Sequence, residues 1–388
     1  MTSVVIAIPV LHIGGTEIQT LNLVRVLISG RHEVTVCCYY EYDVSVVEWF
    51  KTAGARVILL GLDRSDGHFG VSRIFELVRR LIAIFNELGP DIIDIQYVAP
   101  GLVPIIAARI ARIKTVFATV HQPGRPYGRK ARLLLRFGAR LCTSFFCISK
   151  AVEESWFGSS ALFDPKLQKN RKRKHYTIYN AGDLSAIAAT ISCPDRGNLR
   201  RALGLDAHPV VAIVGRLSGE KGHWILLDAM VAVATAFPDV RLLVIGDGPE
   251  RESLKLKAEA LGIASNIFWM GQKEPDEVFK LLAISDIAVV PSLFEGFGLA
   301  AAEAMAVGLP VVGSNVDGLR EVVEQEVTGL LVPPGDSTAL AKALIDLLKN
   351  PERAREMGAK GRKRVRRLFS MERFAEATIG AYGLLAKD

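Results

Sequence analysis

This 388-residue sequence lacks three features that would place it in a special class of proteins. It has no uninterrupted apolar run approaching the roughly 18 residues that a membrane-spanning helix needs. Its N-terminal MTSVVIAIPV has no basic region ahead of the apolar stretch, so we expect a first β-strand there rather than a signal peptide. Its five cysteines are odd in number and show no Cys-x-x-Cys spacing, which argues against a disulfide framework or a zinc site and favours a reducing cytoplasm.

An excess of positive charge is also lacking over most of the chain. The net charge is +7, but the segment 121–180 alone holds thirteen Lys and Arg against three acidic residues, a net +10. The remainder is therefore slightly acidic, and the basic character is local. A local basic patch predicts an anionic partner at that place, such as a phospholipid, a lipid pyrophosphate or a nucleic acid.

Short β-rich runs alternate with helical patterns in two consecutive series. The first series starts with SVVIAIPV and ends with TSFFCIS, and the second runs from PVVAIVGRL to GLLVPPG before the closing helices. Such alternation predicts βαβ units with parallel sheets, here two Rossmann-like, doubly wound α/β domains. We expect these domains over 1–182 and 209–369, a polar linker over 183–208, and a ligand cleft between the carboxyl ends of the two sheets.

The run EGFGLAAAE, which follows the apolar IAVVPS, is the most informative motif. It begins with Glu295, ends with Glu303 and places Gly298 in a turn between a strand and a helix. Free N–H groups at a helix start attract anions, and a glycine lets a ligand come close. Glu303 follows two helical turns later, so the two carboxylates can hold opposite ends of a long ligand such as a nucleotide sugar. The alternative is that Glu295 caps the helix and Glu303 is solvated.

Two further loops follow predicted strands in the second half. VGRLSGEKG contains Arg216 and Lys221, which can clamp a diphosphate as a bidentate donor and a point charge. It is not a Walker A loop, because a glycine follows the lysine. VIGDGPE contains Gly246 and Gly248, and we expect this G-x-G to make a tight turn close to a nucleotide. For VGRLSGEKG the alternative is a solvated basic loop. VIGDGPE lacks the third glycine of a dinucleotide fingerprint and is a weak signal by itself.

The first half supplies two looser candidates. IGGTE contains Gly15, whose backbone we expect to reach an anion, although a simple turn is an equal alternative. His121 ends the run TVFATVH at a strand end that faces the predicted cleft, although a lone histidine is more often structural. No Asp-x-Asp spacing occurs, which argues against a metal–carboxylate clamp. The two cations Arg216 and Lys221, with a helix dipole, are expected to stabilise a leaving diphosphate instead.

Taken together, these motifs resemble the retaining glycosyltransferases of family 4, which have the GT-B fold. The match runs nearly from end to end, through IGGTEIQTLNLVRVL, TVH, FCISK, IYNAGD, VGRLSGEKG, VIGDGPE, PSLFEGFGLAAAEAMAVGLPVV, TGLLVPPGD and FSMERFAE. The EGFGLAAAE stretch is highly specific, and the N-terminal signals are looser. The chain departs from the family at NVDGLREVV, where Asp317 stands at a usual glycine and Arg320 precedes Glu321. It also departs at DIIDIQYV, which lacks the usual histidine near residue 96.

The resemblance implies roles for individual residues. Glu303 would bond the donor ribose, Glu295 the hydroxyls of the donor sugar, and His121 would sit by the transferred sugar. Gly15 would approach the diphosphate or the acceptor. The remaining donor-binding residues would be Arg216, Lys221, Gly246, Gly248, Phe297, Gly298 and Leu299. The closing segment 370–388 is expected to pack back on the N-terminal domain.

We therefore expect a cytoplasmic enzyme that moves a sugar from a UDP- or GDP-linked donor to an acceptor hydroxyl with retained configuration, and that needs no cofactor or metal. The resemblance suggests a same-face mechanism in which the leaving phosphate assists deprotonation of the acceptor. One alternative is a 2-epimerase-type nucleotide-sugar isomerase on the same scaffold, although no acid–base cluster near His121 supports it. Another is nucleic-acid binding by KNRKRKHY, although such a run is usually a solvated loop and no nucleic-acid fold accompanies it.

The segment Arg125–Leu141 predicts membrane contact. If it is helical, an apolar stripe of Leu133, Leu134, Phe137 and Leu141 is surrounded by the cations Arg129, Lys130, Arg132, Arg136 and Arg140. Such a helix suits an anionic membrane surface, to which Lys169–Lys174 would add. The alternative is a core-facing helix with arginines in water. We expect a peripheral enzyme on the inner face of the cell membrane, with a lipid-linked or saccharide acceptor used in cell-surface polysaccharide assembly.

Overall fold

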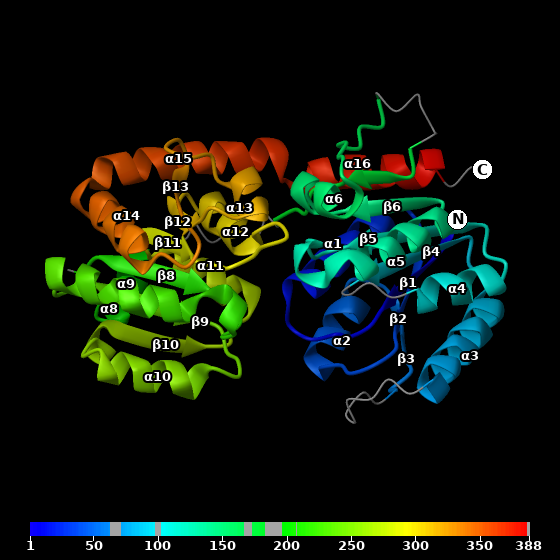
Figure 1. Ribbon diagram of the computed structural model, residues 1–388, viewed down its shortest axis with the longest axis horizontal. Coiled ribbons are helices and arrows are strands. Elements are labelled where there is room, and N and C mark those ends of the chain that lie inside the picture. The colour runs from blue at the N-terminus through cyan, green and yellow to red at the C-terminus, as the bar shows by residue number, and fades with distance from the viewer. Residues whose placement is uncertain (63–70, 98–101, 167–172, 183–195, 207, 386–388) are drawn as a thin grey trace. The chain divides into compact units, whose positions relative to one another are not determined.

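The computed structural model describes residues 1–62, 71–97, 102–166, 173–182, 196–206 and 208–385. The chain divides into two compact units (Figure 1): an N-terminal unit of residues 1–181 with 372–388, and a C-terminal unit of residues 182–371. Each unit is built on one parallel sheet flanked by helices, so the predicted α/β fold with two Rossmann-like sheets is confirmed. The predicted cleft between the domains stays a prediction.

The N-terminal sheet has seven parallel strands in the order β3-β2-β1-β4-β5-β6-β7. They are β1 (Ser3–Ile8), β2 (Glu33–Cys38), β3 (Arg56–Leu59), β4 (Ile92–Tyr97), β5 (Thr115–Val120), β6 (Ser144–Cys147) and β7 (His175–Thr177). The strand order reverses between β1 and β4. Open α/β sheets bind ligands at the carboxyl ends of the strands beside such a switch point, so the ends of β1, β4 and β5 are the candidate ligand-binding positions of this unit.

Helices cover this sheet where the sequence has amphipathic patterns. They are α1 (Gly15–Ser29), α2 (Val44–Thr52), α3 (Val71–Leu88), α4 (Val103–Ile110), α5 (Gly128–Leu141), α6 (Lys150–Phe157) and α16 (Met371–Leu385). The pattern predicts α3 over these same residues, because Leu77, Leu81 and Phe85 recur every four positions and are buried. In α16, Tyr382 and Leu385 join the buried core of the N-terminal unit.

The C-terminal sheet has six parallel strands in the order β10-β9-β8-β11-β12-β13. They are β8 (Val210–Val214), β9 (Arg241–Ile245), β10 (Ile267–Gly271), β11 (Ile287–Val290), β12 (Val311–Ser314) and β13 (Gly329–Val332). Every residue of β11 and β12 is buried, as expected for parallel strands covered on both faces. The switch point lies between β8 and β11, where the loops with the predicted cations and EGFG begin.

The helices of the C-terminal unit complete its layers. They are α8 (Arg196–Ala202), α9 (His223–Ala236), α10 (Arg251–Ala260), α11 (Pro275–Ala283), α12 (Leu299–Ala306), α13 (Asp317–Val322), α14 (Ser337–Lys349) and α15 (Pro351–Leu368). The predicted linker 183–208 contains α8, and Arg200 of this helix pairs with Asp286. The first part of that linker, 183–195, lies outside the described residues. Among the described residues no helix has the length and apolar character needed to cross a membrane.

Candidate functional site

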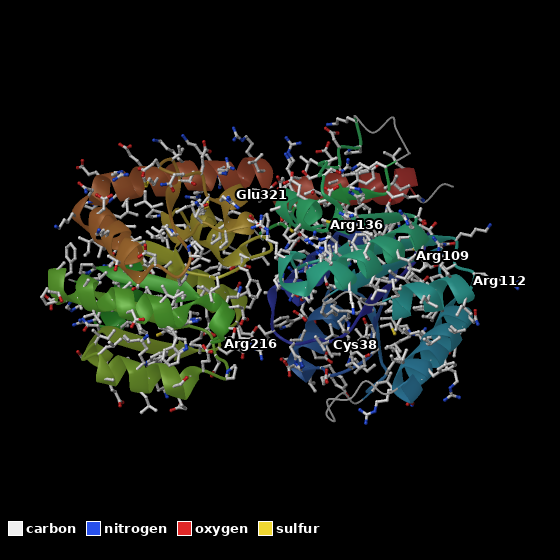
Figure 2. The ribbon with its side chains drawn as sticks, viewed as in Figure 1. Cys38, Arg109, Arg112, Arg136, Arg216 and Glu321 are labelled. Carbon is white, nitrogen blue, oxygen red and sulfur yellow. The ribbon has the colours of Figure 1, made fainter. Side chains whose placement is uncertain are left out.

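Two neighbouring strands of the C-terminal unit bring a predicted cation and a predicted carboxylate together. Arg216 and Lys221 follow β8, and Glu295 follows β11. Lys221 Nζ lies 2.9 Å from the Glu295 carboxylate, with 31% and 16% of the two side chains exposed. Arg216 is exposed (Figure 2). Within this one pair, Lys221 is a cation that could bind a phosphate, and Glu295 is a carboxylate that could accept hydrogen bonds from hydroxyl groups.

The turn before α12 has a backbone that only glycine fits. Gly298 is the N-cap of α12 and has a φ of 99°. A Cβ added there would lie 2.6 Å from the Leu319 side chain, so a larger residue would be strained by conformation and by contact. In the part of the chain that the structure describes, no side chain caps α12, and the Glu295 carboxylate bonds Lys221 instead, so the alternative of Glu295 as a cap is wrong. The first N–H groups of α12 are thus free of a side-chain cap.

Packing from two directions fixes this turn. The Phe297 side chain is buried and meets Phe369 edge-on, with ring centroids 5.1 Å apart. From α13, the Gly318 N–H donates to the Glu295 carbonyl oxygen at 3.2 Å. Asp317, which stands where the family usually has glycine, pairs with Arg320. Because the Phe297 side chain points into the core, its backbone and that of Leu299 are what a ligand would meet.

Glu303 is half-buried on α12, and its carboxylate has no hydrogen-bond or ion-pair partner in the described part of the chain. Burial raises the pKa of Glu303 from 4.5 to about 7. A partly buried carboxylate without a partner is costly when ionised, so this residue is not the fully solvated glutamate of the alternative. A ligand hydroxyl that donates to Glu303 would remove that cost.

The glycines after β9 are explained by contact between two loops. A Cβ at Gly246 would lie 2.0 Å from the Gly215 carbonyl oxygen, and one at Gly248 would lie 2.5 Å from that of Leu217. The loops after β8 and β9 therefore touch through their backbones, which requires glycine at both positions. Between them, Asp247 pairs with Arg251. The prediction that a nucleotide also passes close to this turn stays a prediction.

His223 is a residue of this region that no sequence motif marks as a site residue. It begins α9 directly after the Lys221 loop and is buried, and neither ring nitrogen has a hydrogen-bond partner among the described residues. Burial is the main cause that lowers the pKa of His223 to about 4. A neutral, unsatisfied imidazole beside the cation loop is a polar group that a bound ligand or water would stabilise.

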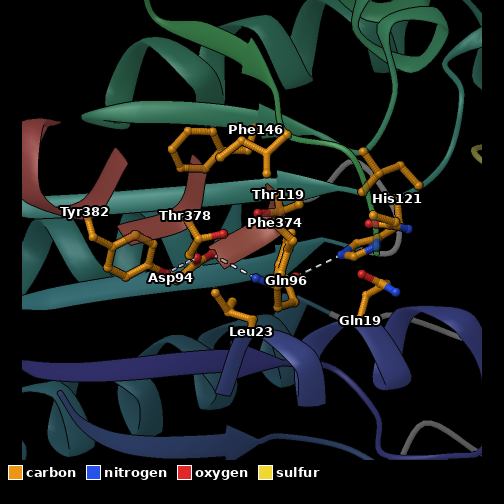
Figure 3. A pocket seen from close by; sticks show the side chains of 13 residues that line it. Gln19, Leu23, Asp94, Gln96, Thr119, His121, Phe146, Phe374, Thr378 and Tyr382 are labelled. Atoms are coloured by element: carbon orange, nitrogen blue, oxygen red, sulfur yellow. Dashed lines mark hydrogen bonds between the residues drawn. The ribbon is translucent and has the colours of Figure 1, made fainter. Parts of the chain in front are cut away.

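In the N-terminal unit, His121 lies at the end of a buried polar chain (Figure 3). His121 Nε2 is 2.8 Å from Gln96 Oε1, and Gln96 Nε2 donates to Asp94 Oδ1 at 3.0 Å. The Tyr382 hydroxyl of α16 donates to the other carboxylate oxygen of Asp94. These residues line a cavity of about 40 Å³. Burial lowers the pKa of His121 to about 4 and raises that of Asp94 to about 6.

Gly15 is exposed at the first position of α1, and the N-cap Gly14 provides no side-chain cap. Glu17, in the same first turn, is buried, and burial raises its pKa to about 7. Further along α1, the Gln19 amide binds the Ala181 carbonyl oxygen at 2.6 Å. The predicted approach of Gly15 to an anion stays a prediction, and Glu17 is a neighbour that sequence reasoning missed.

Helix α5, the predicted basic helix, exposes its apolar stripe to solvent. In α5, Leu133, Leu134 and Phe137 are 67%, 43% and 51% exposed, whereas the core-facing side consists of Leu135, Gly138 and Ala139. The alternative of a core-facing apolar stripe is therefore wrong for these three residues. Leu141 is only partly exposed.

Two of the predicted surface cations have partners inside the unit. Arg136, labelled in Figure 2, donates to the Trp156 carbonyl oxygen at 2.7 Å. Arg173 pairs at 2.7 Å with Glu153, which is fully buried and also bonds His175 and Thr177. Arg173 thus serves a buried network rather than the surface patch predicted over Lys169–Lys174. Residues 169–172 of that patch lie outside the described residues.

Within the described ranges, no group of three or more His, Cys, Asp or Glu side chains could hold a metal ion. The expectation of an enzyme without a metal or cofactor stays a prediction.

Comparisons with known proteins agree with the motifs and the fold. The family model "Glycosyl transferases group 1" matches residues 195–364, and "Glycosyltransferase Family 4" matches residues 13–158. The chain is 31% identical over 382 residues to an uncharacterized glycosyltransferase of Methanocaldococcus jannaschii, a match that covers 95% of this chain and 94% of the relative.

Two further similarities are narrower. The chain is 40% identical over 193 residues to the D-inositol 3-phosphate glycosyltransferase of Segniliparus rotundus, but that match covers 48% of this chain and 43% of the relative, less than half of its length. The solved structure of Anabaena HepE in complex with UDP-glucose has a TM-score of 0.80, covering 99% of this chain and 100% of that one at 21% identity. At that identity the structural similarity shows the shared fold.

Proposed function

Since this chain belongs to the group 1, family 4 glycosyltransferases, we propose that it transfers a sugar from a nucleoside diphosphate sugar to an acceptor hydroxyl with retained configuration. One observation carries the proposal: the β8 and β11 loops place the Lys221–Glu295 pair at the switch point of a sheet, on the strand-to-helix turn that leads to the unpartnered Glu303.

The donor is held by charges of both signs. Lys221 and the exposed Arg216 neutralise the diphosphate, helped by the free N–H groups at the start of α12. Glu303 accepts hydrogen bonds from the ribose hydroxyls, and Glu295 from hydroxyls of the sugar. The paired state of Lys221 and Glu295 supports this division, because the pair presents both charges to one ligand without burying either fully.

In the transfer step, the protein stabilises the leaving diphosphate and does not supply a nucleophile. The acceptor oxygen bonds the anomeric carbon on the face that the diphosphate leaves, and the bond from that carbon to the phosphate oxygen breaks. The acceptor proton passes to the departing phosphate, whose growing charge Lys221 and Arg216 stabilise. Glu295, already committed to Lys221, binds and orients rather than attacks, and His121 contacts the transferred sugar.

A donor screen tests this function. Incubation with UDP- and GDP-linked sugars and a panel of lipid-linked and free saccharide acceptors should release nucleoside diphosphate. NMR of the glycosylated product should show the same anomeric configuration as in the donor. Inverted product would contradict the retaining mechanism. Turnover of donor alone to an epimer would instead favour the 2-epimerase alternative, and release of nothing from any donor would overturn the assignment.

For the acceptor side, we propose that α5 rests on an anionic lipid surface, which makes the protein a peripheral enzyme on the inner face of the cell membrane acting on a lipid-linked acceptor. The exposed Leu133, Leu134 and Phe137 provide the apolar contact. Cations on the same helix, Arg129 and Lys130, are exposed beside them. Apolar area and cations together are what an interfacial helix needs.

Flotation with vesicles tests the lipid proposal. Wild type should float with vesicles of phosphatidylglycerol and phosphatidylcholine at low salt, and either Leu133→Ser with Phe137→Ser or Arg129→Gln with Lys130→Gln should reduce binding. The matched controls are Leu256→Ser on α10, where the leucine is 65% exposed, and Arg366→Gln with Arg367→Gln on α15. Equal flotation of the α5 variants and the controls would show that α5 is not the lipid-binding surface.

A further inference from the structure

A continuous set of hydrogen bonds runs under His121 through the interior of the N-terminal unit (Figure 3). It joins three segments far apart in sequence: Tyr382 from α16, Asp94 and Gln96 from β4, and His121 at the end of β5. All four side chains are buried, with exposed fractions between 2% and 8%. Buried polar groups in such a chain constrain one another's orientation, because each must be satisfied internally.

The direction of each hydrogen bond follows from Asp94, which is the only ionised side chain of the four. The Asp94 carboxylate can only accept, so the Tyr382 hydroxyl and the Gln96 amide nitrogen must donate to it. This turns the amide oxygen of Gln96 toward His121. An amide oxygen also only accepts, so His121 Nε2, 2.8 Å away, must carry the proton.

The reverse orientation of the Gln96 amide leaves two groups unsatisfied. Its oxygen would face the Asp94 carboxylate at 3.0 Å, where neither atom has a proton to donate. The carboxylate is buried, so water cannot repair that contact at low cost. The Asp94 side chain therefore selects one orientation of the Gln96 amide, and the amide selects one tautomer of the imidazole.

We propose that Gln96, held in one orientation by Asp94, is a positioning residue that fixes His121 as its Nε2–H tautomer, so that Nδ1 accepts a hydrogen bond from a hydroxyl of the bound sugar. In the described part of the chain, His121 Nδ1 has no hydrogen-bond partner. The sugar hydroxyl as the ligand rests on the proposed function; the tautomer does not, because it follows from the protein's own contacts.

The tautomer can be measured without any substrate. In protein labelled with 15N-histidine, long-range proton–nitrogen correlations distinguish a protonated from an unprotonated ring nitrogen, and the loss of one set of signals in His121→Asn assigns the residue. We expect wild-type His121 to be neutral at pH 7 with the proton on Nε2. A ring with the proton on Nδ1, or a mixture of both forms, would overturn the proposal even if none of the variants at Gln96, Tyr382 and Gln19 folds.

Three variants then separate positioning from simple packing. Gln96→Met keeps the side-chain volume but removes the acceptor, so we expect a mixture of tautomers. Tyr382→Phe keeps the Asp94–Gln96 bond and should retain the Nε2–H form. Gln19→Met is the matched control, because Gln19 lines the same cavity but, among the described residues, bonds only the Ala181 backbone. An unchanged tautomer in Gln96→Met, or an equal change in Gln19→Met, would contradict a positioning role for Gln96.

The role of Nδ1 is tested with the donor that the screen identifies. Binding of the complete nucleotide sugar should shift the His121 Nδ1 signal, and the nucleoside diphosphate alone should not. An Nε2–H tautomer with no sugar-dependent shift would contradict the sugar contact while leaving the positioning role intact. Failure of every donor to bind or react would count against the proposed function and leave the tautomer measurement as it stands.

Discussion

The two units solve the same structural problem, a polar site at the switch point of a parallel sheet, in opposite ways. In the C-terminal unit, Lys221 and Glu295 are charged, partly exposed and paired at 2.9 Å. In the N-terminal unit, His121 is buried and held neutral, and its partner is the uncharged amide of Gln96. A partly exposed charge pair can rearrange toward a charged ligand, whereas a buried neutral chain holds one geometry and one proton pattern. Under the proposed function, the C-terminal unit stabilises charge and the N-terminal unit orients the sugar.

The largest expected effect comes from removing the cation of the charged site. Lys221→Ala should lower kcat by about 10²–10³-fold, since under the proposed function it removes a group that stabilises the leaving diphosphate, and it also leaves Glu295 unpaired. Steady-state kinetics with the donor from the screen would measure this. Lys363→Ala, an exposed lysine on α15, is the control and should retain wild-type kcat. Similar kcat values for the two variants would remove the basis for calling this the charge-stabilising site.

A smaller effect is expected in the neutral chain. Tyr382→Phe removes a hydrogen bond to Asp94 and should lower the free energy of unfolding by about 1–2 kcal/mol at pH 8. The folded-state pKa of Asp94 is raised from 3.8 to about 6, so ionising it costs stability as the pH rises through this range. The Tyr382 bond offsets that cost only for the ionised form.

The loss in Tyr382→Phe should therefore be larger at pH 8 than at pH 4. Urea unfolding at the two pH values measures it, and Tyr42→Phe, a partly exposed tyrosine, is the control. The same loss at both pH values would show that the phenol contributes through packing against Phe117 rather than through Asp94.

The smallest effect is expected at the rim of the charged site. Arg216→Gln should raise the KM for the donor roughly threefold to tenfold, because an exposed cation contributes about 1 kcal/mol to binding a phosphate. The effect should shrink at high salt, since exposed charges are screened. A loss of donor affinity that does not depend on salt would contradict this prediction. It would indicate a buried contact, whereas Arg216 is exposed.

The fold could be predicted from the sequence because its information is local. The spacing of Leu77, Leu81 and Phe85 marks α3, and the buried apolar runs mark the parallel strands. The EGFG turn was also visible, since Gly298 needs a positive φ at the start of α12. Such features depend on neighbours within a few residues, so a one-dimensional pattern carries them.

The contacts that the sequence did not reveal are the long-range ones. Tyr382 meets Asp94 across 288 positions, and no periodicity relates α16 to β4. Arg173, predicted as part of a surface patch, instead bonds the buried Glu153 that lies 20 positions earlier. For Gly246 and Gly248 the sequence predicts a tight turn close to a nucleotide, and in the structure their close neighbours are the backbones of Gly215 and Leu217. The contacts of these residues can be recognised only in the folded structure, where the sheets bring distant segments together.

Under the proposed function, the carboxylate of Glu303 in the C-terminal unit serves to bind a ligand and does not contribute to stability. Burial raises its folded-state pKa from 4.5 to about 7, so ionisation should cost stability as the pH rises between these values. Glu303→Gln removes the charge and should therefore be more stable than wild type at pH 8 by about 1–2 kcal/mol, a figure discounted for partial exposure. The gain should vanish near pH 4.

The decisive measurement is one calorimetric series at pH 8 on wild type, Glu303→Gln and the exposed-helix control Glu259→Gln, recording both thermal stability and donor affinity. We expect that only Glu303→Gln gains stability and loses donor affinity, by about tenfold to a hundredfold. A Glu303→Gln protein that binds the donor as well as wild type, or that loses stability at pH 8, would contradict the assignment of this carboxylate to the donor.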